Sequence, residues 1–391
     1  MENSISISSL VSDLICSKCH KSYSLFEEQT YASCCNKPLL VQYHLEEHIP
    51  QDEIIGQEQS IWRYAAVLPV LDPINQISLG EGSTPLFSLQ KLASRNGFNK
   101  IYLKDESQNP TGSFKARGLS VAISKAKEFN RSKCIVPTAG NAGGAMAAYC
   151  SKAGMEATVV MPVKTPSIFK EECRLYGANL ILVDGLINDC AKKVAELNRD
   201  HDFFDVSTLK EPYRIEGKKT MGYEIAEQLN WKLPDIIIYP AGGGTGLIGI
   251  WKAFKEMKKM GWIKGKLPKM FAVQSTKCAP IAEAIKDSKN WQTNFIPSAT
   301  IANGLAVPFP FGMDLMLQVL KESEGGVCMI DDSEIIIGLK EIAKTEGLII
   351  SPEGAATWKA LNQLCLKGIV KQSENILLLN TGTGYKYFEN L

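Results

Sequence analysis

The chain has 391 residues, enough for two or three domains with substantial hydrophobic cores. Its 43 basic and 42 acidic residues give a net charge of +1, which provides no electrostatic basis for binding nucleic acid or an acidic membrane surface. Hydrophobic residues make up 45% of the chain, and the apolar stretches are too short and interrupted to predict a membrane-spanning segment.

Residues 1–50 are the first predicted element, a small ribbon-like appendage that carries cysteines. The sequence reads C-x-x-C-H at 16–20 and has a second pair at Cys34 and Cys35. The first 17 residues have no basic n-region and include Glu2 and Asp13, which argues against a secretory signal and predicts a cytoplasmic location. The other cysteines are scattered singly in apolar patterns, as expected of reduced thiols in a core.

The cysteine pattern has three interpretations. A covalent haem anchor is excluded, because such haem is attached outside the cytosol. A zinc ribbon would use Cys16, Cys19, Cys34 and Cys35 as ligands. Adjacent residues rarely direct two thiolates at one tetrahedral ion, so the sequence favours a metal-free ribbon over an occupied zinc site. His20 is an alternative ligand, although it too directly follows a cysteine.

From about residue 100 onward, short β-branched runs alternate with amphipathic segments. The predicted strands are 100–105, 133–139, 156–162, 179–185, 203–207, 235–241, 269–275 and 375–381. The predicted helices include 113–129, 142–154, 167–177 and 246–261. This alternation predicts an α/β fold of two doubly wound domains, with parallel or mixed sheets, around a cleft. The expected boundaries are 1–50 for the appendage, 51–78 for a connecting segment, and 79–220 and 221–391 for the two domains.

Three glycine-bearing turns follow predicted strands, where ligands bind in open α/β sheets. In the first, Asn109–Gly112 reads as a turn and Ser113 as the N-cap of a helix, so Lys115 falls in the first helical turn. The helix dipole and Arg117 would both oppose its ammonium form, which suits a Schiff-base amine or a general base. The alternative is a solvated surface lysine, and this turn taken alone favours it.

The second turn, Thr138-Ala139-Gly140-Asn141, begins a helix of unusually small residues that would let the backbone approach a ligand. A capping role for Asn141 is the alternative, and the turn by itself favours that simpler role.

The third turn contains Gly244-x-Gly246-x-x-Gly249, a match to the dinucleotide fingerprint. A dinucleotide site would also need an acidic residue at the end of the next strand, which instead ends in Gln274 and Ser275. A phosphate site is favoured, since residues 242–246 place successive N–H groups and a threonine hydroxyl at a helix N-terminus.

Five strings together resemble the pyridoxal-phosphate enzymes of the tryptophan-synthase-β fold type, fold type II. They are GEGSTPL (80–86), KDESQNPTGSFKARG (104–118), AGNAGGA (139–145), GGGTG (242–246) and NTGTG (380–384), in the expected order. The resemblance implies that Lys115 forms the Schiff base with pyridoxal 5'-phosphate, with Phe114 beside it. It also implies that Asn141 bonds the phenolic oxygen and that Thr381 meets the pyridine nitrogen. The phosphate would be held by Gly242, Gly243, Gly244, Thr245 and Gly246.

Within these enzymes, residues 205–231, 240–254 and 272–281 are most similar to threonine synthases, and the cysteine appendage resembles the ribbon that precedes many of them. The resemblance implies a lyase that converts O-phospho-L-homoserine and water to L-threonine and phosphate, and a homodimer. Arg214 would bind the substrate phosphate, with Ser207 and Lys218 as further candidates. Backbone N–H groups of Thr138, Ala139 and Gly140 would bind the carboxylate. The alternative for Arg214 is a structural ion pair with Glu216 or Glu211.

Two positions depart from the threonine synthase pattern: Ala116 replaces the usual Asp, and Ala142 replaces a Thr found in many relatives. Both alanines also occur in deaminating and β-replacing enzymes. The alternatives are therefore a threonine or serine ammonia-lyase and a β-replacement enzyme similar to cysteate synthase. A non-catalytic nucleotide-binding or zinc-ribbon binding protein is an alternative of another class, and the retained Lys115 argues against it.

Overall fold

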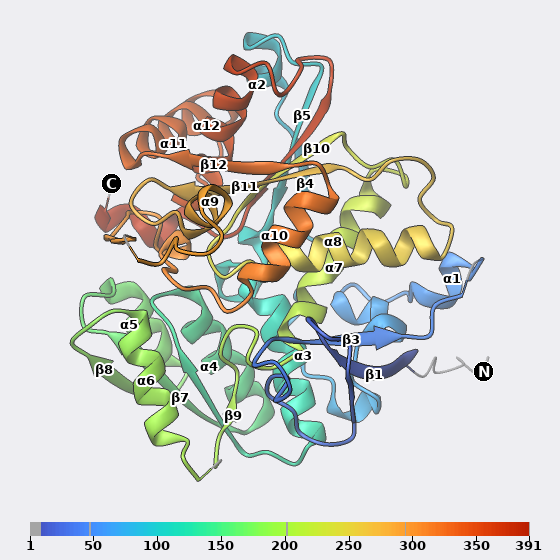
Figure 1. The fold of residues 1–391 in the computed structure, drawn as a ribbon, viewed down its shortest axis with the longest axis vertical. Coiled ribbons are helices and arrows are strands. Elements are labelled where there is room, and N and C mark those ends of the chain that lie inside the picture. Colours follow the sequence, from blue (N-terminus) through green and yellow to red (C-terminus); the bar gives the residue numbers. More distant parts are fainter. Residues whose placement is uncertain (1–8, 47, 201, 294, 391) are drawn as a thin grey trace. The chain divides into compact units, whose positions relative to one another are not determined.

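The computed structural model describes residues 9–46, 48–200, 202–293 and 295–390, and its chain divides into two compact units (Figure 1). The first unit consists of residues up to 83, 115–224 and 249–264, and the second of residues 84–114, 225–248 and 265–391. Among the described residues, no helix is both long enough and apolar enough to cross a membrane.

The N-terminal segment of the first unit is a small antiparallel sheet. Its strands β1 (Val11–Cys16), β2 (Ser22–Tyr23) and β3 (Leu39–Tyr43) lie in the order β2-β1-β3. Every second residue of β3 is buried, namely Leu39, Val41 and Tyr43, as expected of a strand with one face against a core. This sheet is the expected ribbon-like, cysteine-bearing appendage.

The main sheet of the first unit is parallel and has the order β8-β7-β6-β9. Its strands are β6 (Lys133–Pro137), β7 (Glu156–Pro162), β8 (Asn179–Val183) and β9 (Phe204–Asp205). Helices α4 (Asn141–Ala153), α5 (Ser167–Leu175) and α6 (Ile187–Leu197) flank it. Val159 of β7 approaches α4 whereas Val160 packs against α6, so the two helices cover opposite faces.

Three further helices lie wholly or mostly in the first unit: α3 (Lys115–Glu128), α7 (Arg214–Gln228) and α8 (Thr245–Lys259). Helices α3 and α7 approach closely at two glycines. A Cβ on Gly217 would lie 2.0 Å from the carbonyl oxygen of Arg117, and one on Gly118 would lie 2.7 Å from that of Arg214. Side chains at these positions would separate the helices.

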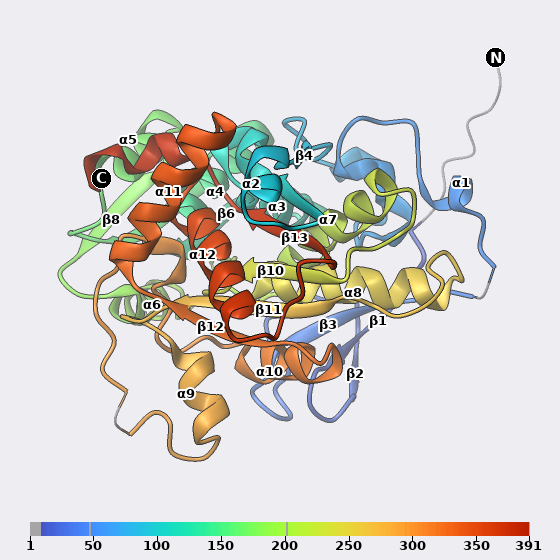
Figure 2. The same cartoon turned by 90° about the horizontal axis from the view of Figure 1, so that it is seen from above.

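The second unit contains a six-stranded sheet in the order β12-β11-β10-β13-β5-β4, in which only β4 is antiparallel. The strands are β4 (Leu86–Ser88), β5 (Lys100–Asp105), β10 (Ile236–Pro240), β11 (Lys269–Ser275), β12 (Gly326–Ile330) and β13 (Asn375–Asn380). Its helices are α2 (Gln90–Arg95), α9 (Pro280–Lys286), α10 (Met313–Glu322), α11 (Asp332–Glu346) and α12 (Pro352–Leu366). Helices α11 and α12 lie side by side (Figure 2) and enclose a core with Ile238, Val273 and Leu378.

The remaining helical pieces are short. They are α1 (Gln51–Ile54) and the 3₁₀ turns η1 (Ile61–Val67), η2 (Pro73–Asn75), η3 (Glu106–Gln108), η4 (Pro110–Gly112), η5 (Asn303–Leu305) and η6 (Gly384–Asn390).

All eight predicted strands are present, and the predicted α/β class with parallel and mixed sheets is confirmed. The units differ from the contiguous stretches 79–220 and 221–391 that the sequence suggested. Strand β5 pairs with β13 and so belongs to the sheet of the second unit. The chain therefore leaves and re-enters each unit several times.

Candidate active site

In the second unit, three loops follow three neighbouring parallel strands. Residues 241–244 follow β10, Thr381 follows β13, and residues 106–114 follow β5. Parallel neighbours end at one edge of a sheet, which is where ligands bind in such folds. The loops are in contact there: the Phe114 N–H donates to the Thr381 carbonyl at 3.0 Å, and the Phe114 and Tyr239 rings lie 6.4 Å apart, edge to face.

Lys115 follows Phe114 directly and is the first residue of α3, as the sequence predicted. It is half-buried, which argues against the solvated surface lysine that was the alternative. The predicted N-cap is wrong. Ser113 is buried in an extended conformation with φ of −161°, and its Oγ has no hydrogen-bond partner among the described residues.

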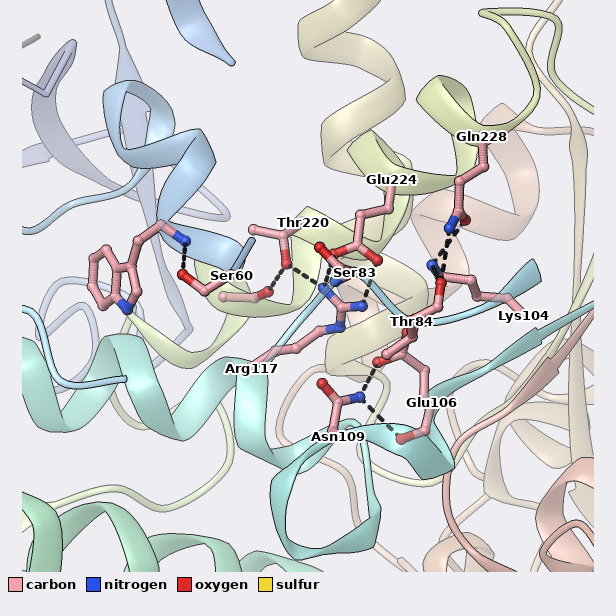
Figure 3. A network of polar contacts seen from close by, with 12 residues as sticks. Ser60, Ser83, Thr84, Lys104, Glu106, Asn109, Arg117, Thr220, Glu224 and Gln228 are labelled. Atoms are coloured by element: carbon pink, nitrogen blue, oxygen red, sulfur yellow. Dashed lines mark hydrogen bonds and ion pairs between the residues drawn. The ribbon is translucent and has the colours of Figure 1, made fainter. Parts of the chain in front are cut away.

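Arg117 has a structural role that differs from the expected one (Figure 3). Its guanidinium is fully buried and forms two hydrogen bonds of 2.7 Å with the two carboxylate oxygens of Glu224. It also donates to Thr220 at 3.0 Å. Because this charge is neutralised by a bidentate partner, Arg117 supplies little of the field that was expected to oppose the ammonium form of Lys115.

The loop that leads to Lys115 is fixed by buried polar residues of the second unit (Figure 3). The Glu106 carboxylate accepts from the Thr84 hydroxyl at 2.7 Å and from the Asn109 amide at 2.8 Å. Lys104 donates to the Thr84 carbonyl at 2.8 Å. The next residues, Thr111 with φ of 61° and Gly112 with φ of 66°, are both left-handed and reverse the chain toward Ser113.

The glycine loop ends at Thr245, the first residue of α8, so the first N–H groups of this helix have no intrahelical partner. Tight packing also requires its glycines. A Cβ on Gly242 would lie 2.0 Å from the Gly304 carbonyl oxygen, and one on Gly246 would lie 1.9 Å from the Tyr239 hydroxyl. The loop therefore combines sharp backbone geometry with the donors expected of a phosphate site.

The second predicted turn belongs to the first unit. The Thr138 hydroxyl accepts from the Gly140 N–H at 3.1 Å, and α4 begins at Asn141, which is half-buried. The small residues of α4 have a packing role that the sequence did not reveal. A Cβ on Gly144 would lie 2.3 Å from the Glu172 carboxyl group on α5.

Two substrate-binding candidates lie close together in the first unit, in the loop after β9 and at the start of α7. Arg214 is buried and donates to the Val206 carbonyl at 2.5 Å and to the Thr208 hydroxyl at 3.5 Å, while its Nε has no hydrogen-bond partner among the described residues. Burial lowers the pKa of Arg214. The Ser207 hydroxyl bonds the Asp205 carboxylate at 2.5 Å.

The structure supports only part of the alternative role for Arg214, which was an ion pair with Glu216 or Glu211. Glu216 pairs instead with Lys219 at 2.8 Å and Lys252 at 2.5 Å. Glu211 accepts from the backbone N–H of Arg214 at 2.9 Å. The third candidate, Lys218, is fully buried close to Gly118 of α3, which favours a structural role.

The family model described as "Pyridoxal-phosphate dependent enzyme" matches residues 77–382. The chain belongs to this family. It is therefore a pyridoxal-phosphate-dependent enzyme, and its curated relatives indicate a lyase. The threonine synthase of Methanocaldococcus jannaschii is 32% identical over 95% of this chain and 92% of that protein. The threonine synthase of Methanosarcina acetivorans is 33% identical over 94% and 91%.

Solved structures support the fold. Diaminopropionate ammonia lyase from Escherichia coli has a TM-score of 0.67 at 21% identity, over 78% of this chain and 85% of that one. Maize serine racemase has a TM-score of 0.66 at 23% identity, over 77% and 88%. At these identities the likeness establishes the fold of this pyridoxal-phosphate enzyme and not its substrate.

The residues present fit the cofactor. The N-terminus of α8 and the Thr245 hydroxyl would supply donors for a phosphate, Lys115 would supply an amine for the aldehyde, and Thr381 would supply a neutral hydroxyl for the ring nitrogen. Next to Lys115, the buried hydroxyls of Thr111 and Ser113 have no hydrogen-bond partner among the described residues. Such unsatisfied donors are rare in the absence of a ligand or water.

The sequence did not single out two further polar groups near these loops. They are the Asn303 Nδ2 and the Glu353 Oε2, both buried without a hydrogen-bond partner among the described residues. Glu353 accepts from the Gly304 N–H at 2.7 Å, and the Gly304 carbonyl faces Gly242. The sequence around Asn303 and Glu353 has no motif that would have indicated either residue.

The four ribbon cysteines form a cluster of their own. The Sγ atoms of Cys16, Cys19, Cys34 and Cys35 all lie within 4.8 Å of one another. The geometric objection raised by the adjacent pair therefore does not hold, because both thiols reach the cluster.

Proposed function

We propose that this enzyme converts O-phospho-L-homoserine and water to L-threonine and phosphate. The observation that carries the proposal is the similarity to proteins named threonine synthase, which extends over more than nine-tenths of both chains at 32% and 33% identity. A cytoplasmic location and a homodimer remain predictions.

Lys115 would move the protons. Pyridoxal phosphate, when bound, supplies an electron sink that stabilises negative charge at Cα of an amino acid. The Lys115 amine would accept the proton from Cα and then one from Cβ. The Cγ–O bond breaks, phosphate leaves, and water supplies a hydroxyl at Cβ while protons return to Cγ and Cα. Lys115 directly follows Phe114, whose N–H donates to the Thr381 carbonyl, and a single amine would serve the successive proton transfers.

Two loops of the first unit would hold the substrate ends. In the turn Thr138–Asn141, the Thr138 N–H donates to the Val160 carbonyl at 2.9 Å and the Gly140 N–H to the Thr138 hydroxyl at 3.1 Å. Of the three predicted donors, the Ala139 N–H would therefore be the one that binds the carboxylate, at the start of α4. Arg214 and Ser207 would bind the phosphate, and the Arg214 Nε, unpartnered among the described residues, supports this assignment. A planar guanidinium binds phosphate oxygens in a fork that lysine cannot reproduce.

Thr381 would limit the reaction type. It lies after β13. The side-chain amide of its neighbour in sequence, Asn380, donates to the Asp105 carboxylate at 2.7 Å. A neutral hydroxyl at the ring nitrogen does not enforce protonation as a carboxylate would. A threonine at this position therefore favours elimination and replacement over transamination.

Two assays test the proposal. Phosphate release from O-phosphohomoserine is compared with oxoacid release from threonine, and borohydride-reduced protein is mapped for a pyridoxyl peptide. We expect phosphate and threonine from the first substrate and labelling at Lys115. Oxoacid release alone would replace the synthase by an ammonia-lyase, consistent with Ala116 and Ala142, and labelling elsewhere would refute the role of Lys115.

The phosphate assignment has a separate test. Arg214→Gln should raise the KM for O-phosphohomoserine at least about tenfold, since a charge-assisted pair is lost, with a smaller change in kcat. Lys193→Gln, at an exposed ion pair with Glu196, is the control and should leave KM unchanged. An unchanged KM in the Arg214 variant would remove this residue from the substrate site.

A further inference from the structure

We propose that Cys16, Cys19, Cys34 and Cys35 bind one structural Zn²⁺ ion as a tetrathiolate. Their four Sγ atoms lie within 4.8 Å of one another, and those of Cys19 and Cys34 are 3.4 Å apart. Four sulfurs at about 2.3 Å from a tetrahedral zinc ion would be separated by about 3.8 Å. The thiols are thus gathered at nearly the spacing that the metal requires.

The first pair lies on a tight turn at the end of β1. Cys16 is the last residue of that strand, and the Lys18 N–H donates to its Sγ at 3.4 Å. The His20 N–H donates to the Cys16 carbonyl at 3.0 Å, and His20 has φ of 60°. The turn brings Cys19 back toward Cys16, and a backbone N–H directed at sulfur stabilises a thiolate ligand.

The second pair lies on a turn closed by the bridge between Ala32 and Lys37. The Cys35 N–H donates to the Ala32 carbonyl at 3.3 Å, and Asn36 is left-handed with φ of 49°. Adjacent residues of a strand point to opposite faces, but those of a tight turn do not. This turn is the reason that both thiols of an adjacent pair reach one cluster.

The ligand chemistry favours zinc. Four sulfurs in a tetrahedral set suit Zn²⁺ or iron, and zinc binds a given site more tightly than Fe²⁺. A closed set of four ligands is typical of a structural site, not a catalytic one. Four thiolates and Zn²⁺ carry a net charge of −2, and Lys18, Lys21 and Lys37 on the same two turns offset it.

Such a crosslink would also stabilise the ribbon. Its strands have six, two and five residues, which bury little apolar surface of their own. Its β3 ends at Tyr43, whose hydroxyl donates to Glu216 of α7 at 2.8 Å and whose ring faces the Lys219 ammonium at 3.7 Å. A metal that rigidifies the ribbon would therefore hold this strand against α7.

The test uses the full-length protein, purified with reductant and zinc. We expect about one zinc per chain that survives gel filtration, and a zinc-edge X-ray absorption spectrum with four sulfur neighbours at about 2.3 Å. Four titratable thiols without metal, a Cys19–Cys34 disulfide, bound iron, or a nitrogen ligand such as His20 would each overturn the proposal. These measurements need no substitution and do not depend on the substrate.

Variants add a second line of evidence. Changes near a metal site cost about 10–100-fold in affinity even when the ligands are kept, so Cys16→Ser and Cys35→Ser should lose zinc by at least that factor in chelator competition. Cys365→Ser, a half-buried thiol outside the cluster, is the matched control and should retain it. Zinc retention by both ligand variants would contradict the assignment, and if they fail to fold, the wild-type spectrum still decides.

Discussion

Glu211 is fully enclosed at the start of α7, where its carboxyl group accepts from the backbone N–H groups of Tyr213 at 2.7 Å and Arg214 at 2.9 Å. Burial raises the pKa of Glu211 to about 8, although the nearby Arg214 charge acts in the opposite direction. Below that pH the folded protein keeps a proton that the unfolded chain, with an ordinary carboxyl pKa near 4.3, has released.

The sign of the pH dependence follows from this difference. Where the folded state binds more protons than the unfolded state, stability falls as pH rises. Glu211 should thus lower the free energy of unfolding progressively from about pH 4.3 to about pH 8. Glu211→Gln keeps a carbonyl acceptor without the titration, so its stability relative to wild type should increase between pH 5 and pH 8.

Urea unfolding at a series of pH values measures the effect. Glu196→Gln, at an exposed carboxylate, is the control and should follow the wild-type profile. Parallel profiles for Glu211→Gln and wild type would show that Glu211 does not hold its proton in the folded state.

At this scale the sequence identified some residues and not others. Lys115 could be placed in a first helical turn because the turn signals lie next to it in the chain. The ion-pair partner of Arg117 could not be predicted from the sequence. Glu224 lies 107 residues away, and any buried carboxylate could have paired with the guanidinium. Ser113 has a good capping side chain, but its extended backbone directs the hydroxyl elsewhere.

At the scale of elements, the loop between β10 and α8 depends on a backbone contact. A Cβ on Gly242 would lie 2.0 Å from the Gly304 carbonyl oxygen, which is backbone and cannot rotate away. Gly242→Ala should therefore displace the loop and raise the dissociation constant of pyridoxal phosphate at least about tenfold, equivalent to about 1.4 kcal/mol. Absorbance titration of the apoenzyme with pyridoxal phosphate measures this dissociation constant.

Gly326→Ala in β12 is the matched control. Its added Cβ would meet the Phe271 ring at 3.4 Å, an ordinary contact, and cofactor affinity should stay near the wild-type value. Equal affinities in the two alanine variants would mean that the glycine loop does not hold the phosphate.

Elements with strong local patterns were predictable. The buried runs of β10 and β13 are typical of strands, whereas β12 begins at Gly326, directly after Gly325, and this glycine pair is typical of a turn. The antiparallel β4 has only three residues. The order of the strands could not be predicted, because neither segment contains a sequence pattern that indicates the pairing of β5 with β13.

At the scale of the whole molecule, the last strand completes the larger sheet. Strand β13 pairs with β10 on one side and β5 on the other, and Ile376, Leu377, Leu378 and Leu379 are fully buried. A chain that ends after Glu374 should lose cooperative unfolding, because β10 and β5 each lose one of their two neighbours and the sheet is split. Pulse proteolysis should find it degraded while the full-length chain survives.

A chain that ends after Tyr387 is the control, because it keeps β13 and removes the exposed Phe388. It should resist the protease as the full-length protein does. Resistance of the shorter chain as well would show that β13 is dispensable for the fold.

The distance in sequence between β5 and β13 also has a consequence during translation. Asn375 is the register partner of Lys100, so a ribosome adding about 5–20 residues per second needs roughly 15–55 seconds between them. For that time β5 has only the short β4 as a neighbour, and its other edge stays open. The larger sheet can close only after β13 has been synthesised, so the nascent protein must be kept from aggregating until that strand is available.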